Sequence, residues 1–350
     1  MFDLDGPNVA SMAYQGALAP LDHLLSPEDR TRMLPSLVAQ GTWRDHLWAV
    51  GAFDSGLAMW ADHSQLVRAG VRIPKGPDDA WTATEMSGAL AALAAHDADH
   101  KVIDLGLSAI ATEWATYAFA PMVYSAGAQL IDPNTGKATG TLDSPAAVGA
   151  LGAIVGWERY ADLNADGKAF TSRRVALSWN GHWMYPTYSA ALGSDLVLVP
   201  LPNMGLGTKS GQGSWAWAVG AHSTRKAAAT SLLEWLTNDA GATAMANANG
   251  AVPGTRNALA RSALVGPGKP LHLFGDQLSR ACGTGPVTKD CVTVARPVTP
   301  AYPTVTAAFS TAVLLALRGT DPHKALSAAA RTIDENLLAN HEYSRPLSSS

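Results

Sequence analysis

The sequence has little charge of either sign and no long hydrophobic run. Only 15% of its 350 residues are charged, and the formal net charge is −4. Nucleic-acid binding requires a basic face and binding to an anionic membrane surface requires a polybasic patch, so neither partner is expected. The longest apolar candidate, 307–317, contains Ser310 and Thr311, and it falls short of the roughly 20 residues of a membrane span.

The chain also has few cysteines. Cys282 and Cys291 lie nine positions apart in a polar loop rich in Gly, Pro and Thr. Two free thiols or one local disulfide are both compatible with this spacing. The disulfide is favoured because both ends of the loop can meet, and it would indicate an oxidising compartment. No His lies near either cysteine, so a zinc site is not expected, and neither a metal nor a cofactor is predicted.

Hydrophobic residues and tryptophan are plentiful. Hydrophobic residues make up 47% of the sequence, and it contains eleven Trp but only six Phe. Such a composition argues against disorder, and 350 residues are too many for one small core and suit two lobes. Indole offers a flat apolar face and one N–H donor, which suits both a sugar ring and an ordinary core.

The stretch 175–217 concentrates these rings. It predicts an apolar strand, a tight Asn-Gly turn at 180–181, a helical segment, and then two further strands. Trp179, Trp183 and Trp215 lie at strand ends or just after turns. Rings at those places could form the wall of a ligand cleft, although each one taken alone is more often part of a core.

Several sequence blocks follow one another in a recognisable order. They are Gly16 to Asp22, Asp45 to Trp60, Asn180-Gly181-His182-Trp183, Leu201-Pro202, Gly211 to Trp215, Gly250 to Arg256 and Arg296 to Pro303. Together they resemble family 1 extracellular solute-binding proteins, the maltose-binding-protein-like, carbohydrate-binding subunits of ABC importers. This sequence departs from the usual family pattern at His182 and Gly51, where the family commonly has Pro.

The resemblance implies an α/β, two-lobe periplasmic-binding-protein type II fold. The first lobe would comprise 1–54 and 216–265, and the second 57–212 and 266–342, with a hinge near 53–56 and 212–216 and a tail at 343–350. Relatives carry an export signal, a first strand and a first helix before the point where this chain begins to match. The first lobe is therefore expected to be incomplete, with Met1 as an internal start or a truncation.

The resemblance also places candidate ligand contacts. Tyr117 is expected on a loop ahead of a helix at 120–127, either touching ligand or buried in the core. Asp5 and Asn8 are either cleft residues or helix caps, and Arg256 is more often a surface ion pair than a ligand clamp. The predicted ligand-binding residues are Asp5, Asn8, Asp54, Ser55, Trp114, Tyr117, Trp179, His182, Trp183, Gly213, Ser214, Trp215, Arg256 and Tyr302.

The implied function is ligand capture for an ABC importer by hinged closure, with a sugar or oligosaccharide as the ligand. The implied partners are membrane permease subunits, the expected state is a monomer, and the expected location is extracytoplasmic, although Met1 to Asp5 do not read as part of an export signal. A glycerol-phosphate ester or another polyol is an alternative ligand. A truncated sensor is a further alternative, as is a glycosidase built on Asp5, Asp54 or Glu113, but no spacing singles out a catalytic pair.

Overall fold

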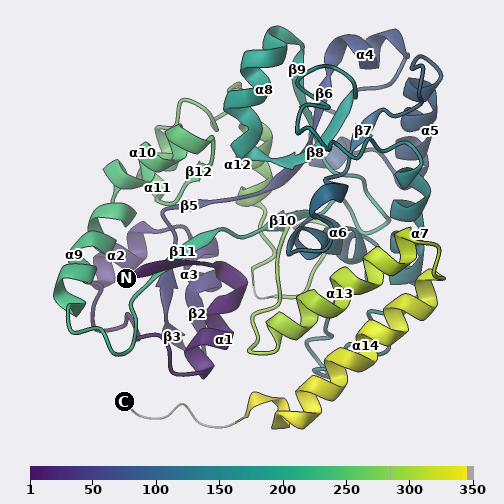
Figure 1. The fold of residues 1–350 in the computed structure, drawn as a ribbon. Coiled ribbons are helices and arrows are strands. Elements are labelled where there is room, and N and C mark those ends of the chain that lie inside the picture. The colour runs from purple at the N-terminus through teal and green to yellow at the C-terminus, as the bar shows by residue number, and fades with distance from the viewer. Residues whose placement is uncertain (284, 345–350) are drawn as a thin grey trace.

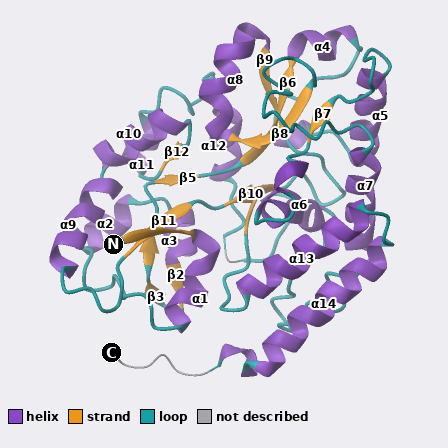
Figure 2. Cartoon of the chain, viewed as in Figure 1, coloured by secondary structure: helices purple, strands orange, loops and turns teal. Residues whose placement is uncertain are grey.

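The computed structural model describes residues 1–283 and 285–344, so most of the predicted tail lies outside the described residues. Helices and strands form two groups, which lie on the left and right of Figure 1, and Figure 2 shows that helices surround the strands in both. Among the described residues no helix has both the length and the apolar character needed to cross a membrane.

The left group is built on a three-stranded antiparallel sheet in the order β1-β11-β4 (Phe2–Asp5, Trp215–Ala218 and Ala49–Val50). Two short pairs accompany it, β2 with β3 (Thr42–Trp43 and His46–Leu47) and β5 with β12 (Phe53–Asp54 and Val252–Pro253). The helices of this group are α1 (Val9–Tyr14), α2 (Pro27–Arg32), α3 (Pro35–Gly41), α9 (Lys226–Thr237), α10 (Asp239–Asn249) and α11 (Arg256–Ala260).

The right group is built on a four-stranded sheet in the order β7-β8-β6-β9 (Ile103–Asp104, Leu177–Gly181, Leu57–Asp62 and Leu196–Val199). Beside it β10 (Ser210–Gln212) runs parallel to β13 (Thr293–Ala295). The helices are α4 (His63–Arg68), α5 (Ala83–Ala94), α6 (Trp114–Ser125), α7 (Pro145–Glu158), α8 (Tyr185–Leu192), α12 (His272–Ser279), α13 (Tyr302–Leu317) and α14 (Pro322–Ala339).

Strand β6 is buried on both faces of this sheet, in keeping with the apolar run of its first five residues. Successive side chains of a strand point to opposite faces. Met59 accordingly joins the large core formed with α5, α6, α7, α13 and α14. Trp60 points to the other face, where it packs against Phe274 of α12 and Tyr188 of α8. Helices therefore cover both faces of the second sheet.

The chain passes between the two groups at two short segments and again between α11 and α12. Ser55 and Gly56 separate β5, which pairs with β12, from β6 in the four-stranded sheet. Gly213 and Ser214 separate β10 from β11 in the three-stranded sheet. Both segments fall at the places where the sequence predicts a hinge.

Two local predictions are wrong. The Asn-Gly pair at 180–181 forms no turn, because β8 continues through it and pairs with β6 as far as Gly181 opposite Leu57. The loop predicted before residue 120 is instead the first turns of α6, which begins at Trp114. Trp114 and Tyr117 are therefore three residues apart on a helix, a spacing that puts them on the same face.

Candidate functional site

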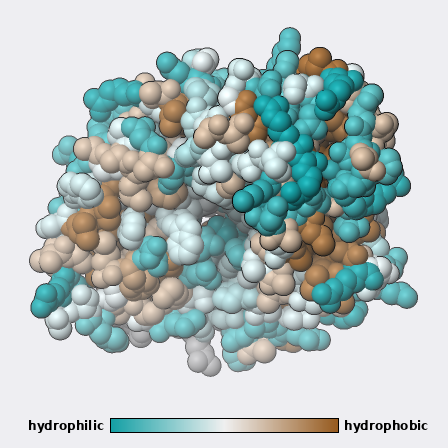
Figure 3. Space-filling model, turned by 45° about the horizontal axis from the view of Figure 1, so that its top comes forward, coloured by the Kyte–Doolittle hydropathy of each residue, from teal (hydrophilic) through white to brown (hydrophobic). Residues whose placement is uncertain are grey.

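A cavity of about 520 Å³ lies at the crossing segments, between elements of the two groups. We call it the front cavity. The face of the molecule seen in Figure 3 carries mixed polar and apolar side chains and is hollowed near its middle. The front cavity is lined by Asp5, Phe53, Ser55, Ala109, Thr112, Glu113, Trp114, Tyr117, His182, Trp183, Gly213, Ser214, Trp215, Asn249 and Arg296.

Aromatic rings form one wall of this cavity. Tyr117 and Trp183 stack with their ring centroids 6.4 Å apart and an angle of 26° between the ring planes. Trp183 can lie there because Gly181 has no side chain: a Cβ on Gly181 would lie 2.1 Å from its indole. Trp183 remains 37% exposed and Trp215, on β11, 55% exposed. Exposed indole is costly in water, so these two faces are suited to cover an apolar ligand surface.

The crossing segment 55–56 contributes a neutral hydrogen-bonding centre. His182 Nδ1 lies 3.0 Å from the carbonyl oxygen of Asn249, which can only accept, so Nδ1 carries the proton. Nε2 then accepts from the Ser55 hydroxyl at 2.9 Å. Burial lowers the pKa of His182 to about 4, against the opposing effect of the Asn249 hydrogen bond. The imidazole is therefore uncharged at neutral pH.

Arg296 supplies the one guanidinium among the described residues that line the front cavity. Both of its terminal nitrogens contact Asp5 at 2.8 Å, and Nη1 also contacts Glu113 Oε1 at 2.8 Å. Its Cζ lies 4.7 Å from the centroid of the Tyr117 ring. Glu113 further accepts from the Tyr302 hydroxyl and, at 2.7 Å, from Thr306. Two carboxylates facing one guanidinium leave the cavity with an excess negative charge.

Nine of the predicted ligand contacts line the front cavity, and five do not. Tyr302 is 0% exposed and reaches the cavity only through its bond to Glu113. Asp54 is also fully buried, and it accepts hydrogen bonds from the Ser55 backbone and from Gln212. Asn8 is half-buried and makes no capping bond with its side chain. These three positions support the cavity or lie away from it.

The other two placements are corrections. Trp179 is 0% exposed and packs edge-on against Phe119 in the core of the second sheet, so it has no face to offer a ligand. Arg256 is exposed on α11 and points to the backbone of Thr31, beside a separate shallow pocket. Both residues belong to sequence blocks that resemble the family, but neither side chain lines the front cavity.

The sequence predictions overlooked several lining residues, notably Phe53, Asn249 and Arg296. Arg296 opens the same Arg-Pro block that contains Tyr302, and of these two residues it is Arg296 that lines the front cavity. Asn249 contributes its backbone carbonyl, which carries no sequence signal. Phe53 lies next to the predicted hinge and contacts His182 edge-on, with centroids 6.2 Å apart.

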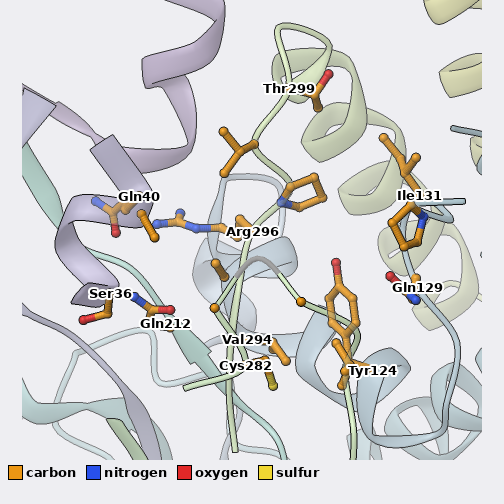
Figure 4. Close-up of a pocket in the computed structure, with 18 of the residues that line it drawn as sticks. Ser36, Gln40, Tyr124, Gln129, Ile131, Gln212, Cys282, Val294, Arg296 and Thr299 are labelled. Atoms are coloured by element: carbon orange, nitrogen blue, oxygen red, sulfur yellow. The ribbon is translucent and has the colours of Figure 1, made fainter. Parts of the chain in front are cut away.

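A second cavity, of about 580 Å³, lies on the other side of the crossing segment 212–214 (Figure 4). We call it the rear cavity. Arg296, Gln40 and Gln212 lie on one side of it, and Ile131 and Gln129 lie on the opposite side. Gln40 holds the backbone of Ser214 with both atoms of its amide, at 2.7 and 3.0 Å. Arg296 lines both cavities.

Two further sequence features are placed by the structure. Cys282 and Cys291 form a disulfide with their Cα atoms 5.0 Å apart. Among residues 1–283 and 285–344 no cluster of three or more His, Cys, Asp or Glu is arranged to hold a metal ion.

The family model for bacterial extracellular solute-binding proteins matches residues 1–265, three quarters of the chain. The chain belongs to this family. No curated protein sequence matches it. For this solute-binding protein, membership implies an extracytoplasmic place of action and a permease as partner.

Solved structures of similar fold extend the match over nearly the whole chain. The GacH receptor of Streptomyces glaucescens, solved unliganded and with acarbose, is 22% identical with a TM-score of 0.73 and covers 97% of this chain and 83% of that one. A solute-binding protein of Thermotoga lettingae bound to α-D-tagatose is 22% identical, with a TM-score of 0.77 and coverage of 96% and 84%. Maltose-bound MalE3 of T. maritima is 19% identical, with a TM-score of 0.76 and the same coverage. The predicted two-lobe α/β fold is confirmed.

Proposed function

We propose that this solute-binding protein captures a neutral sugar or oligosaccharide in the front cavity and presents it to an ABC permease. The observation that carries the proposal is the stacked pair of Tyr117 and Trp183 facing a cavity edged by carboxylates. The C–H face of a sugar ring is apolar and its rim is polar, so a ring wall with acceptors around it complements both parts. The ligands of the similar structures, acarbose, tagatose and maltose, support the same class.

The charges of the site favour an uncharged ligand over a phosphate ester. Asp5 and Glu113 outnumber Arg296 on the cavity wall, and His182 is neutral. An anionic ligand would lose its hydration and gain no free cation in return, which is unfavourable. The ligands of the similar structures, acarbose, tagatose and maltose, include no phosphate ester, so they give glycerol-phosphate esters no support.

Binding is also favoured over glycoside hydrolysis. A glycosidase needs one carboxyl that can donate a proton to the leaving oxygen. Both oxygens of Asp5 accept from Arg296. Both oxygens of Glu113 accept as well, from Arg296 and Tyr302 on one side and from Thr306 on the other. Both carboxyl groups are therefore engaged with donors of the protein itself.

Calorimetry against maltose, maltotriose, tagatose and glycerol 3-phosphate tests the proposal. We expect at least one sugar to bind and the phosphate ester not to bind. Trp183→Ala should weaken the sugar by about tenfold or more, because a buried aromatic face contributes roughly 1.5–3 kcal/mol and 1.4 kcal/mol is a factor of ten.

Trp235→Ala is the matched control, because this indole is 57% exposed on α9 and lines neither cavity. It should leave the affinity unchanged. Binding of the phosphate ester alone, or equal weakening by both substitutions, would contradict the proposal. Release of a free sugar from a glycoside in the same samples would instead show an enzyme.

A further inference from the structure

The contacts of Arg296 join parts of the chain that belong to different sheets. Asp5 is the last residue of β1, in the three-stranded sheet. Arg296 follows β13, which pairs with β10, and Glu113 immediately precedes α6 in the second group. Asp5 and Arg296 are 291 residues apart in sequence. The Asp5–Arg296 ion pair is therefore a direct link between the two lobes at the edge of the front cavity.

The guanidinium depends on its partners because it has little contact with water. The Arg296 side chain is only 7% exposed, and its Nε has no hydrogen-bond partner. Burial by itself would lower the pKa of Arg296, but the charges of Asp5 and Glu113 outweigh it and the pKa is raised. Removing one partner of a buried ion pair is costly because it leaves the other charge uncompensated.

A second contact crosses between the lobes on the other flank of the cavity. There His182 of the second lobe meets the Asn249 carbonyl at the end of α10. That contact joins two neutral groups. The ion pair differs, because separating the lobes would leave Arg296 with Glu113 alone.

We propose that the Asp5–Arg296 ion pair is a latch that holds the two lobes at the separation seen here, with Arg296 as the positioning residue. Glu113 and the Tyr117 ring keep the guanidinium on the second lobe, and Asp5 engages or leaves it as β1 moves with the first lobe. A ligand-binding protein whose resting equilibrium is biased in this way loses less affinity to the closing step. The proposal rests on the two-lobe fold and on no particular ligand.

The test is small-angle X-ray scattering of the ligand-free full chain. Asp5→Asn keeps the shape of the side chain and removes its charge, and it should shift the radius of gyration to a larger value. The matched control is Asp3→Asn, since Asp3 lies two residues earlier on the same strand and is exposed. It should reproduce the wild-type scattering curve.

A second variant keeps the test decisive if the first does not fold. Arg296→Lys retains one positive charge but cannot contact two oxygens of Asp5 and Glu113 together, so an intermediate radius of gyration is expected. Circular dichroism verifies that each variant is folded. A radius equal to that of wild type in folded Asp5→Asn overturns the proposal, and so does a smaller one, which would mean that the pair holds the lobes apart. Because no ligand is added, either result is independent of sugar binding.

Discussion

Asp54 and His182 should give the stability of the protein two opposite pH dependences within one pH window. Both are buried at the crossing segment, at 0% and 1% exposure, and Ser55 bonds to each of them. Burial raises the pKa of Asp54 from 3.8 to about 6, despite hydrogen bonds from Ser36, Ser55 and Gln212 that lower it. Burial lowers the pKa of His182 from 6.5 to about 4.

The signs follow from proton linkage. The folded protein prefers Asp54 protonated, so the stability this group contributes is present below pH 3.8 and is lost as pH rises through about 6. The folded protein prefers His182 neutral, so its contribution is present above pH 6.5 and is lost as pH falls through about 4. At about 1.36 kcal/mol per pKa unit, each contribution amounts to about 3 kcal/mol. The two nearly cancel in the wild-type protein.

Urea unfolding followed by Trp fluorescence between pH 4 and 7 would separate them. The measured quantity is the free energy of unfolding of each variant minus that of wild type, which removes the groups that both proteins share. For Asp54→Asn this difference should rise by about 2–2.5 kcal/mol from pH 4 to 6.5, and for His182→Gln it should fall by about 2–2.5 kcal/mol over the same range.

The double variant is the control. It lacks both groups, so its difference curve should be nearly flat, apart from the coupling expected between neighbours. Flat curves for both single variants would refute the reasoning, because they would show that neither pKa is displaced in the folded state. Slopes of the same sign would show that the structure around Ser55 changes with pH.

The other predictions concern stability and the shape of the cavity wall. Replacing Cys282 and Cys291 by Ala should lower the free energy of unfolding by about 2–3 kcal/mol, since their disulfide closes a short loop; urea unfolding in the absence of reductant measures this. Leu233→Ala on α9, where the side chain is 0% exposed, should cost about 2–5 kcal/mol, and its neighbour Leu232→Ala, at 45% exposure, should change stability by less than about 0.5 kcal/mol. Equal losses from the two leucines would contradict the packing of α9. Gly181→Ala should displace the indole that lies against this glycine and weaken sugar binding severalfold, with an altered Trp emission spectrum; unchanged affinity would show that the stacked wall is not used.

Much of the fold could be predicted because its signals are local. The apolar run 57–61 flanked by a polar break indicates a buried strand beside a crossing point, and β6 begins two residues after Asp54–Ser55. Gly16 ends α1 with a positive φ of 71°, as a glycine helix terminator should. Such features depend on neighbouring residues, so the order of the blocks along the chain was enough to identify the family.

The tertiary structure decided which aromatic residues face the cavity. Trp179 and Trp183 are four residues apart and equally apolar, yet one is fully buried and the other 37% exposed. The difference arises because α6 brings Phe119 over the face of β8 that carries Trp179. No sequence pattern states which helix covers which face of a strand, and hence which indole is left for a ligand.

The charge arrangement of the site was also decided by the tertiary fold. The sequence by itself determined a two-lobe fold and a supply of tryptophans, and it predicted where the chain would cross between the lobes. Asp5, Glu113 and Arg296 come from three distant segments, and their 2.8 Å contacts exist only because the fold brings the end of β1, the segment after β13 and the start of α6 together. Ion pairing acts over a few ångströms in space and is indifferent to separation along the chain, so only the folded structure could reveal it.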